Sequence, residues 1–397
     1  MRLFFLKREK KEDFLVLDIG TEAVKTLILE KYKDKIIISA AALEYFDSYG
    51  LFDSKNFEAE IIKKTISKTI QDLETKRLPE NVFFGLPANI LKVKILLQSV
   101  KRKNSKALID KKEAESVCQE VLNEAQKIVS QLILDESGIL AKDLHFISLK
   151  ILEIKIDGYQ VPTLQGYSGE NLVFRVLTIS LPKDYFKDIE GIARTLHLKN
   201  FTILHPAQSL PLVHLPKSEN SIFLDVGGKT TQIVLIKDGK LEKIESFEGG
   251  GEAFSQIISQ DLGIRERDGK ELKERYSNKL LSIEAKNKIR EILAKPQREW
   301  YENLKSKIKE INPTGLLPPT LFLFGGGSLL PEIQEILEEG DWRGPRFTNQ
   351  PEIKFIYPKD CYLPLNPKEG KSSTLILNNP QYTPSFLIFY AYARKIF

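Results

Sequence analysis

Two copies of one short pattern, roughly 200 residues apart, constrain the fold of this chain more than any other feature. Each copy is an apolar run that ends in an aspartate, a turn that contains glycine and threonine, and a second apolar run. When Asp18 of the first copy is aligned with Asp225 of the second, Gly20 falls on Gly227. Two distant strand–turn–strand copies predict two similar lobes rather than a solenoid of many repeats.

The turns of both copies are suited to holding phosphate. Glycines let backbone N–H groups approach an anion closely, threonine hydroxyls add donors, and a nearby carboxylate can hold a metal ion or its water. One copy alone is more typical of an ordinary tight hairpin. The coincidence of two copies favours the phosphate-binding interpretation.

Composition limits the class of protein. A length of 397 residues allows two or three domains, and 42% apolar with 28% charged residues is typical of a soluble globular protein. The net charge of +5 is too small and too dispersed to indicate nucleic-acid binding. Cys118 and Cys361 form no CxxC pair and indicate a reducing compartment. No run approaches the roughly 18 apolar residues of a spanning helix, so we expect a cytoplasmic protein.

Hydrophobic periodicity predicts a chain of mixed strands and helices. Apolar residues recur at helical spacing in the ranges 55–76, 110–134, 185–197, 253–262, 268–300, 331–339 and 384–397. A third strand at 36–41 would complete a meander with the first copy. The segment 81–181 combines strands with one helix and is interpreted as a small α+β insertion.

A third glycine-rich element follows the expected strand 321–324. Its stretch 325–328 is Gly-Gly-Gly-Ser, and a helix is expected from Pro331. Glycines here permit positive φ and close approach of a flat ligand to the backbone, ahead of a helix N-terminus. The stretch 228–230, Gly-Lys-Thr, imitates the end of a P-loop but lacks the earlier glycine that this motif requires.

Taken in order, these three elements resemble the phosphate-1, phosphate-2 and adenosine motifs of the superfamily that contains actin, sugar kinases and heat-shock chaperones. The resemblance covers essentially the whole chain. The segment 81–181 is similar to the SHS2-type subdomain 1C of two bacterial families, the cell-division protein FtsA and the type IV pilus assembly protein PilM. The stretch 249–254, Gly-Gly-Gly-Glu-Ala-Phe, also resembles the helix start that follows phosphate-2 in these families.

The resemblance implies an α/β, actin-like (ribonuclease H-like) fold with two lobes and an inserted SHS2-type α+β subdomain. The expected parts are a basic-apolar leader, 1–13; subdomain 1A, 14–80 and 182–216; subdomain 1C, 81–181; subdomain 2A, 217–264 and 320–397; and the helical subdomain 2B, 265–319.

The resemblance also implies that the two lobes close on ATP and Mg²⁺. Asp18 and Asp225 would face the metal ion from the two lobes and act with Gln208, which lies near where actins carry the glutamine that orients the hydrolytic water. The residues expected to bind the nucleotide are Gly20, Thr21, Lys25, Gly227, Gly228, Thr230, Thr231, Gly250, Lys273, Gly325, Gly326, Gly327 and Ser328.

The chain departs from the family pattern around its second turn. Lys229 and Gln232 stand where a third glycine and an acid are usual, and Lys229 could either add charge beside a phosphate or block the loop. Lys273 matches the lysine of the family's nucleotide helix, whereas the ribose-binding acid is missing or displaced to Glu271. We therefore expect ATP binding but at most slow hydrolysis.

Three functions fit this resemblance. The first is an FtsA-type scaffold that links a cytoskeletal division ring to the membrane through ATP-dependent self-association into filaments, with a tubulin-like division protein as partner. Thr21 after Gly20 and the stretch 48–50 favour this function. The second is a PilM-like cytoplasmic factor of pilus or secretion assembly that binds a membrane-protein peptide, which Val24-Lys25 suits as well. The third is a sugar-kinase-like phosphotransferase, for which we find no convincing substrate-binding acid.

The FtsA resemblance implies a peripheral position at the inner face of the cell membrane. In that family a linker and an amphipathic helix follow the actin core, whereas this sequence ends at Phe397 within the expected closing helix. Membrane contact is therefore assigned to the apolar tip at 4–6, to the segment 390–397, or to a partner.

Overall fold

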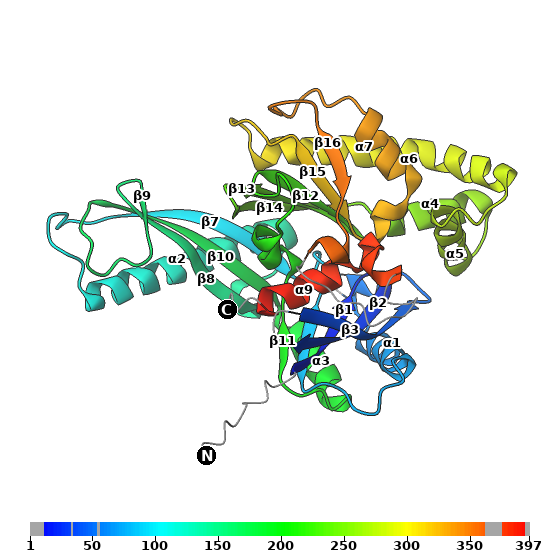
Figure 1. Ribbon diagram of the computed structural model, residues 1–397, viewed down its shortest axis with the longest axis horizontal. Coiled ribbons are helices and arrows are strands. Elements are labelled where there is room, and N and C mark those ends of the chain that lie inside the picture. The colour runs from blue at the N-terminus through cyan, green and yellow to red at the C-terminus, as the bar shows by residue number, and fades with distance from the viewer. Residues whose placement is uncertain (1–11, 33–34, 54–55, 362–374, 394–397) are drawn as a thin grey trace, which may run out of the picture. The chain divides into compact units, whose positions relative to one another are not determined.

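A computed structural model describes residues 12–32, 35–53, 56–361 and 375–393 (Figure 1). The apolar tip at 4–6 and the residues after 393 lie outside the described residues, so the expectations of membrane contact placed there stay predictions. The chain divides into two compact units. One contains the residues up to Pro87 together with those from Gly191 on, and the other is Ala88–Glu190.

The first unit contains two sheets of five strands each. In the first sheet the order is β11-β6-β1-β2-β3. Its strands are β1 (Glu12–Ile19), β2 (Ala23–Tyr32), β3 (Lys35–Tyr45), β6 (Asn81–Gly85) and β11 (Phe201–Ile203). The central strand β1 pairs antiparallel with β2 and parallel with β6, and Asp18 near its end lies opposite Lys25.

The second sheet repeats the first strand for strand, in the order β14-β13-β12-β15-β16. Its strands are β12 (Ser221–Val226), β13 (Thr230–Lys237), β14 (Lys240–Glu248), β15 (Thr320–Phe324) and β16 (Glu352–Phe355). Here β12 pairs antiparallel with β13 and parallel with β15, and Asp225 lies opposite Gln232. The two copies of the short sequence pattern thus belong to two lobes whose sheets have the same topology, as the pattern predicts.

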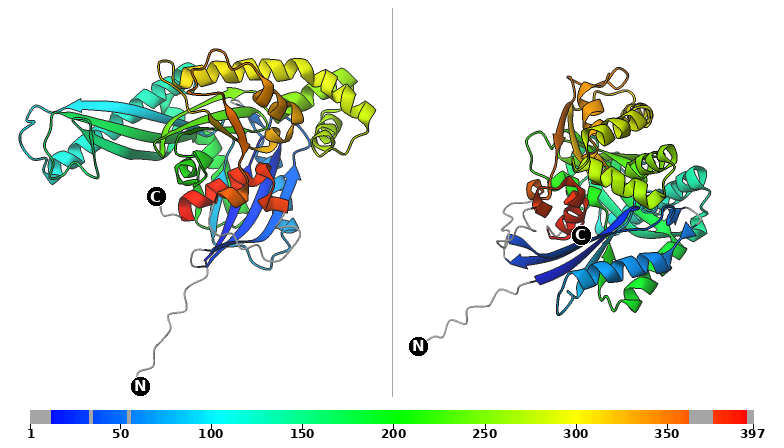
Figure 2. Two further views of the ribbon diagram at one scale, coloured as in Figure 1. Left: turned by 45° about the horizontal axis from the view of Figure 1, so that its top comes forward. Right: turned by 90° about the vertical axis from the view of Figure 1, so that its right-hand side faces the viewer.

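Helices cover both faces of the first lobe's sheet. Figure 2 shows α1 (Ala59–Asp72) and α9 (Thr383–Ala393) on opposite sides of it. The helix α9 is apolar on nearly all faces because it is buried: Phe389 is fully buried and packs its ring on those of Phe14 and Phe83. The two-stranded pair β4 (Phe52–Asp53) and β5 (Asn56–Phe57) precedes α1.

The second lobe has its own core between its sheet and four helices. The helices are α4 (Gly251–Leu262), α5 (Glu266–Ser277), α6 (Ile283–Ile311) and α7 (Pro331–Glu339). Alternate residues of β12 and β13, such as Leu224 and Ile233, point into this core with Trp300 of α6. Short 3₁₀ turns connect the elements of this unit: η2 (Pro206–Leu212), η3 (Gly326–Leu329), η4 (Pro358–Asp360) and η5 (Pro380–Tyr382).

The second unit is an α+β layer of its own. Its sheet has the order β7-β10-β8-β9, with β7 (Lys92–Lys101), β8 (Leu144–Ile156), β9 (Tyr159–Val161) and β10 (Asn171–Pro182). The long helix α2 (Lys111–Ser137) packs on one face against Phe174 and Val176. It begins where the Asp110 side chain accepts the N–H of Glu113 at 2.8 Å, and it ends at Gly138 with φ +73°. The turn η1 (Ala141–Asp143) follows it, and α3 (Lys183–Thr195) follows the last strand.

Two expected boundaries differ from the structure. The insertion was expected to start at residue 81, whereas β6 pairs with β1 in the first lobe's sheet and the second unit begins at Ala88. The expected helix 268–300 is two helices. Asn278 ends α5, and the hydroxyl of Ser282 caps α6 by accepting the N–H of Ala285 at 3.3 Å. None of the described helices has both the length and the apolar character to cross a membrane.

Two leucines near the C-terminus test the burial of α9. Leu387 is fully buried on this helix, whereas Leu375 is 73% exposed. We expect Leu387→Ala to lower the free energy of unfolding by about 2–5 kcal/mol, because it removes contacts and leaves a cavity. Leu375→Ala should change it by less than about 0.5 kcal/mol. Urea unfolding measures both, and equal effects would contradict the placement of α9 in the core.

Candidate functional site

The repeated aspartates lie near the ends of the two central strands. Asp18 is 8% exposed, and its Oδ2 accepts a hydrogen bond from Lys25 Nζ at 3.0 Å. The hydroxyl of Ser385, on α9, donates to the same oxygen at 2.7 Å. Because Lys25 lies directly opposite Asp18 in the strand register, the β1–β2 pairing itself brings the two charges together.

Asp225 has a different environment. The neutral Gln232 is its cross-strand partner, so its own lobe supplies no cation at that position. The pKa of Asp225 is raised to about 7, chiefly by burial; the charge of Lys25 opposes this rise, and the negative charge of Asp18 adds to it. Gly325, with φ +93°, packs against this carboxylate, since a Cβ there would lie 2.4 Å from Asp225 Oδ1. The third glycine-rich element therefore meets the second turn directly.

The two aspartate turns close in the same way and touch each other. In the first, the N–H of Gly20 donates to the carbonyl of Ala23 at 2.9 Å; in the second, the N–H of Gly227 donates to that of Thr230 at 3.0 Å. Between the lobes, the N–H of Lys229 donates to Thr21 Oγ1 at 2.8 Å. An amide and a hydroxyl that were expected to face phosphate are therefore bonded to each other.

Backbone carbonyls of the second turn accept hydrogen bonds from the first amides of α4. The N–H of Gly251 donates to the carbonyl of Gly227, and that of Glu252 to the carbonyl of Gly228, both at 2.9 Å. A Cβ at Gly250 would lie 2.4 Å from the Gly227 oxygen, so this position accepts only glycine without a backbone shift. These first amides of the helix, which in an anion site would face the ligand, have partners within the chain.

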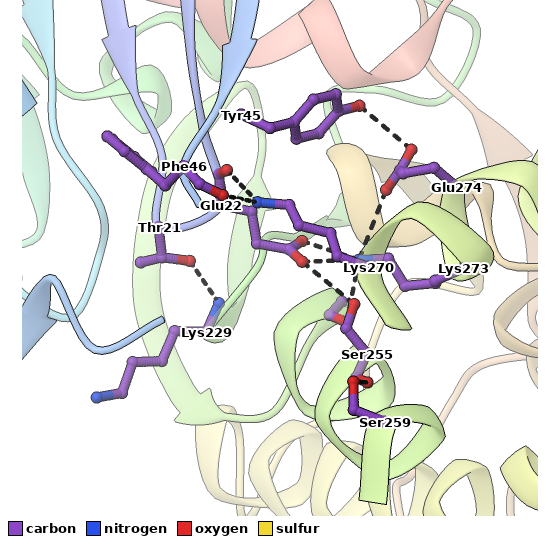
Figure 3. A network of polar contacts seen from close by, with 11 residues as sticks. Thr21, Glu22, Tyr45, Phe46, Lys229, Ser255, Ser259, Lys270, Lys273 and Glu274 are labelled. Carbon is purple, nitrogen blue, oxygen red and sulfur yellow. Dashed lines mark hydrogen bonds and ion pairs between the residues drawn. The ribbon is translucent and has the colours of Figure 1, made fainter. Parts of the chain in front are cut away.

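An ion pair joins the lobes beside these turns (Figure 3). Lys273 Nζ, on α5, lies 2.8 Å from Glu22 Oε1 and 3.0 Å from Oε2, and the side chains of Lys273 and Glu22 are only 3% and 13% exposed. Burial by itself would raise the pKa of Glu22, but the charges of Lys273 and Lys270 outweigh it and lower this pKa. Burial would likewise lower the pKa of Lys273, and Glu22 and Glu274 raise it instead. Both groups are therefore charged at neutral pH.

A second lysine of α5 strengthens this connection. Lys270 Nζ donates to the backbone carbonyls of Glu22 and Phe46, the latter at 3.2 Å, and lies 4.9 Å from the centre of the Tyr45 ring. Burial lowers the pKa of Lys270 to about 8. The hydroxyl of Tyr45 lies 3.2 Å from Glu274 Oε2. Figure 3 shows that Glu22 and Tyr45 of the first lobe lie beside Lys270, Lys273 and Glu274 of α5.

Other residues expected at the site have hydrogen bonds within the chain. The Thr231 hydroxyl donates to the carbonyl of Gly249 at 2.7 Å and accepts the indole N–H of Trp300 at 2.9 Å. Gln208 Oε1 accepts the N–H of His205 at 3.0 Å, which caps η2. The catalytic role of Gln208 and the phosphate contact of Thr231 stay predictions.

The remaining residues of the glycine stretch 325–328 differ in what they face. The hydroxyl of Ser328 donates to the carbonyl of Gly325 at 2.6 Å, and a Cβ at Gly327 would lie 2.9 Å from the Gly227 oxygen. Gly326 alone in this stretch is exposed, with open space where a side chain would be. Thr230 is half-buried at the start of β13. Nucleotide contacts of these residues also stay predictions.

The residues present do not fit a triphosphate in this conformation. The carboxylate of Glu22 lies against Lys273, the turns bond to each other, and the start of α4 bonds to the second turn. An open cavity of about 510 Å³ beside α4 is lined by Glu248, Glu252 and Glu266 with only one lysine, Lys229, so it would repel phosphate. No group of three or more His, Cys, Asp or Glu side chains suited to a metal ion occurs in the described ranges. Mg²⁺ stays a prediction.

Several residues of this site were not predicted from the sequence, among them Glu22, Lys270 and Ser385. Glu22 stands in an exposed-looking turn, and its partner is 251 positions away in the sequence. Ser385 is a single hydroxyl in an apolar helix. Two lysines three positions apart, Lys270 and Lys273, lie on one side of their helix, and this spacing was a weak signal of a shared acidic partner.

Comparisons with known proteins give a structural likeness only. Neither a protein-family model nor a curated protein matches the sequence. The structure of a PilM–PilN type IV pilus biogenesis complex matches with a TM-score of 0.68 and 16% identity, over 95% of this chain and 98% of that chain. The ethanolamine utilization protein EutJ of Carboxydothermus hydrogenoformans is more distant, with a TM-score of 0.48 and 12% identity over 95% of this chain and 89% of that chain. The structure of MreB 5 of Spiroplasma citri bound to AMPPNP has a TM-score of 0.45 and 10% identity over 97% of this chain and 98% of that chain.

The likeness confirms the predicted fold. The chain has an actin-like fold of two lobes with an inserted α+β unit. The likeness to the PilM structure extends over nearly the whole length of both chains, so the insertion belongs to the shared architecture.

The raised pKa of Asp225 predicts a pH dependence of stability. Between its ordinary value near 4 and about 7, the folded chain retains a proton on Asp225 that the unfolded chain releases. The free energy of unfolding should therefore fall as pH rises through this window, and Asp225→Asn should flatten the dependence by on the order of 1 kcal/mol or more.

Urea unfolding at pH 5 and pH 8 measures this difference. The matched control is Asp238→Asn, because Asp238 is exposed in a turn where φ is +50° and asparagine is well tolerated. This control should keep the wild-type pH dependence. If Asp225→Asn also kept it, Asp225 would not retain a proton near neutral pH.

Proposed function

We propose that this chain is a cytoplasmic scaffold of the PilM type, which binds a short segment of a membrane protein and thereby takes part in assembling a pilus or secretion machine. The observation that carries the proposal is the likeness to the PilM–PilN structure over nearly the full length of both chains. In this proposal the chain works by binding, and chemistry at its cleft is secondary.

The surface of the inserted unit supports a binding role. Eight of the sixteen large hydrophobic side chains that are exposed in the described part of the chain belong to Ala88–Glu190, about a quarter of the sequence. Among them, Leu97 of β7 is 61% exposed. It pairs with Arg175, whose neighbours Phe174 and Val176 point to α2, so Leu97 stands on the face of the sheet opposite α2. Leu97 therefore offers an apolar contact on this face to a protein partner.

The contacts at the cleft favour a scaffold over a phosphotransferase. The residues that would have to hold a phosphate donor are bonded within the chain, as described above. We propose that ATP with Mg²⁺ binds only to a conformation in which Glu22 has left Lys273, with Asp18 and Asp225 then facing the ion. Hydrolysis, if present, would be slow. The peripheral position at the inner membrane face would come from the bound partner.

The FtsA-type function is the second candidate, because the sequence favours it at Thr21 and the same fold would serve it. It requires self-association and a tubulin-like division protein as partner. Pelleting of the chain with that protein and lipid vesicles, in a manner that depends on ATP, would favour this candidate. A steady ATP turnover that rises steeply with a small hydroxylated acceptor would favour the sugar-kinase alternative.

A binding experiment tests the first candidate. The full chain is immobilised and exposed to short synthetic peptides that cover the cytoplasmic segments of pilus inner-membrane proteins from the same genome. We expect one peptide to bind, and Leu97→Asp to weaken that binding by about tenfold or more, because a charge replaces an apolar contact. Surface plasmon resonance gives the dissociation constants.

The matched control is Leu280→Asp, since Leu280 is 66% exposed but lies in the second lobe. This variant should bind the peptide like the wild type. Binding of no pilus peptide, together with capture of a purified tubulin-like protein, would reject the PilM-type proposal.

A further inference from the structure

The turn between β1 and β2 places one acidic side chain of the first lobe inside the second. Glu22 follows Thr21 in this turn, and its carboxylate reaches Lys273 and Ser255, whose hydroxyl lies 3.4 Å from Oε1. Its Oε2 also lies against the first residue of α4, because a Cβ on Gly251 would be 2.8 Å from it. Figure 3 shows the side chain entering this group of residues from the first lobe.

The surroundings of this carboxylate have the properties of an anion site. Lys273 supplies a buried positive charge and Ser255 a hydroxyl, and the positive end of the α4 dipole is adjacent. Lys273 Nζ also donates to the carbonyl of Gly251 at 3.1 Å, which fixes the ammonium at this helix end. The groups that would attract a phosphate thus surround a carboxylate that belongs to the chain.

The same contacts join the lobes. Glu22 belongs to the first lobe, whereas Lys273, Ser255 and Gly251 belong to the second. The hydrogen bond from the Lys229 N–H to Thr21 Oγ1 lies next to them and also crosses between the lobes. Leaving a buried charge without its partner is strongly unfavourable. When the lobes open, Glu22 and Lys273 must therefore each be hydrated or pair with another ion.

We propose that the Glu22 carboxylate is a built-in anionic ligand, which holds the two lobes closed on Lys273 without nucleotide and competes with nucleotide phosphates for that lysine. The proposal concerns only the chain's own cleft. It does not depend on which partner the chain binds, so its test is independent of the PilM-type proposal.

A titration tests the competition. The probes are ATP with Mg²⁺ and, separately, inorganic tripolyphosphate, added to the full chain in a calorimeter. Glu22→Gln keeps the size of the side chain but removes its charge, so it should bind both probes about tenfold more tightly than the wild type, or better. The double variant Glu22→Gln/Lys273→Ala should lose this gain, because the lysine is the common target.

The matched control is Glu44→Gln. Glu44 forms an ion pair with Lys68, but both residues belong to the first lobe. This variant should bind the probes like the wild type. Equal affinities of the wild type and Glu22→Gln, measured on variants whose circular dichroism is unchanged, would overturn the proposal.

Hydrogen exchange tests the closure itself, in the wild type and in the same two single variants. The amide of Lys229 reports contact between the lobes, because its acceptor is Thr21 Oγ1. In the wild type without nucleotide this amide should exchange slowly, and ATP with Mg²⁺ should not slow it further. In Glu22→Gln it should exchange about tenfold faster or more, and in Glu44→Gln at the wild-type rate. Fast exchange in the wild type that slows only with ATP would overturn the proposal.

Discussion

The rest of this structure depends on two carboxylates near the ends of two equivalent strands, Asp18, which is buried, and Asp225, which is partly buried. A buried carboxylate must be paired, hydrogen-bonded or protonated, because an isolated one costs far more than a fold can tolerate. Asp18 is paired with Lys25 and hydrogen-bonded by Ser385, which ties β2 and the C-terminal helix to the first turn. Asp225 faces neutral Gln232 and retains a proton up to about pH 7. The charge of Lys25 thus pairs with Asp18 and also lowers the pKa of Asp225. The two lobes differ here because the first has Lys25 opposite its aspartate and the second has Gln232.

The sequence predicted the fold well, for reasons that are local. The aspartate turns mark the ends of strands, and the alternation of apolar residues within each strand is visible without any partner. Helix α7 falls in the range that its periodicity and Pro331 indicate. The errors arose where the decisive contact is distant: Asn81–Gly85 looks like the start of the insertion because nothing near it in the sequence reveals its pairing with β1.

The candidate site was predictable only in part, because its contacts cross between lobes. The three motifs do meet, since Gly325 packs on Asp225 and the turn at Lys229 on Thr21. Thr231 shares the core-facing side of β13 with Ile233, so strand alternation could have assigned its hydroxyl to the interior rather than to phosphate. No such rule reveals Glu22, because an acid in a turn normally faces solvent, and its role depends on a lysine that only the closed fold brings near.

The ion pair across the lobes has a consequence for how the protein would respond to its surroundings. Because Glu22 and Lys273 belong to one chain, the effective concentration of the carboxylate at the lysine is set by the geometry of the fold. It does not change with the concentration of any dissolved ligand. A clamp that closes on a dissolved ligand reports the concentration of that ligand. With the lobes held closed by Glu22 as proposed, the closed shape would depend less on the ATP concentration than in a protein that closes only on a bound nucleotide.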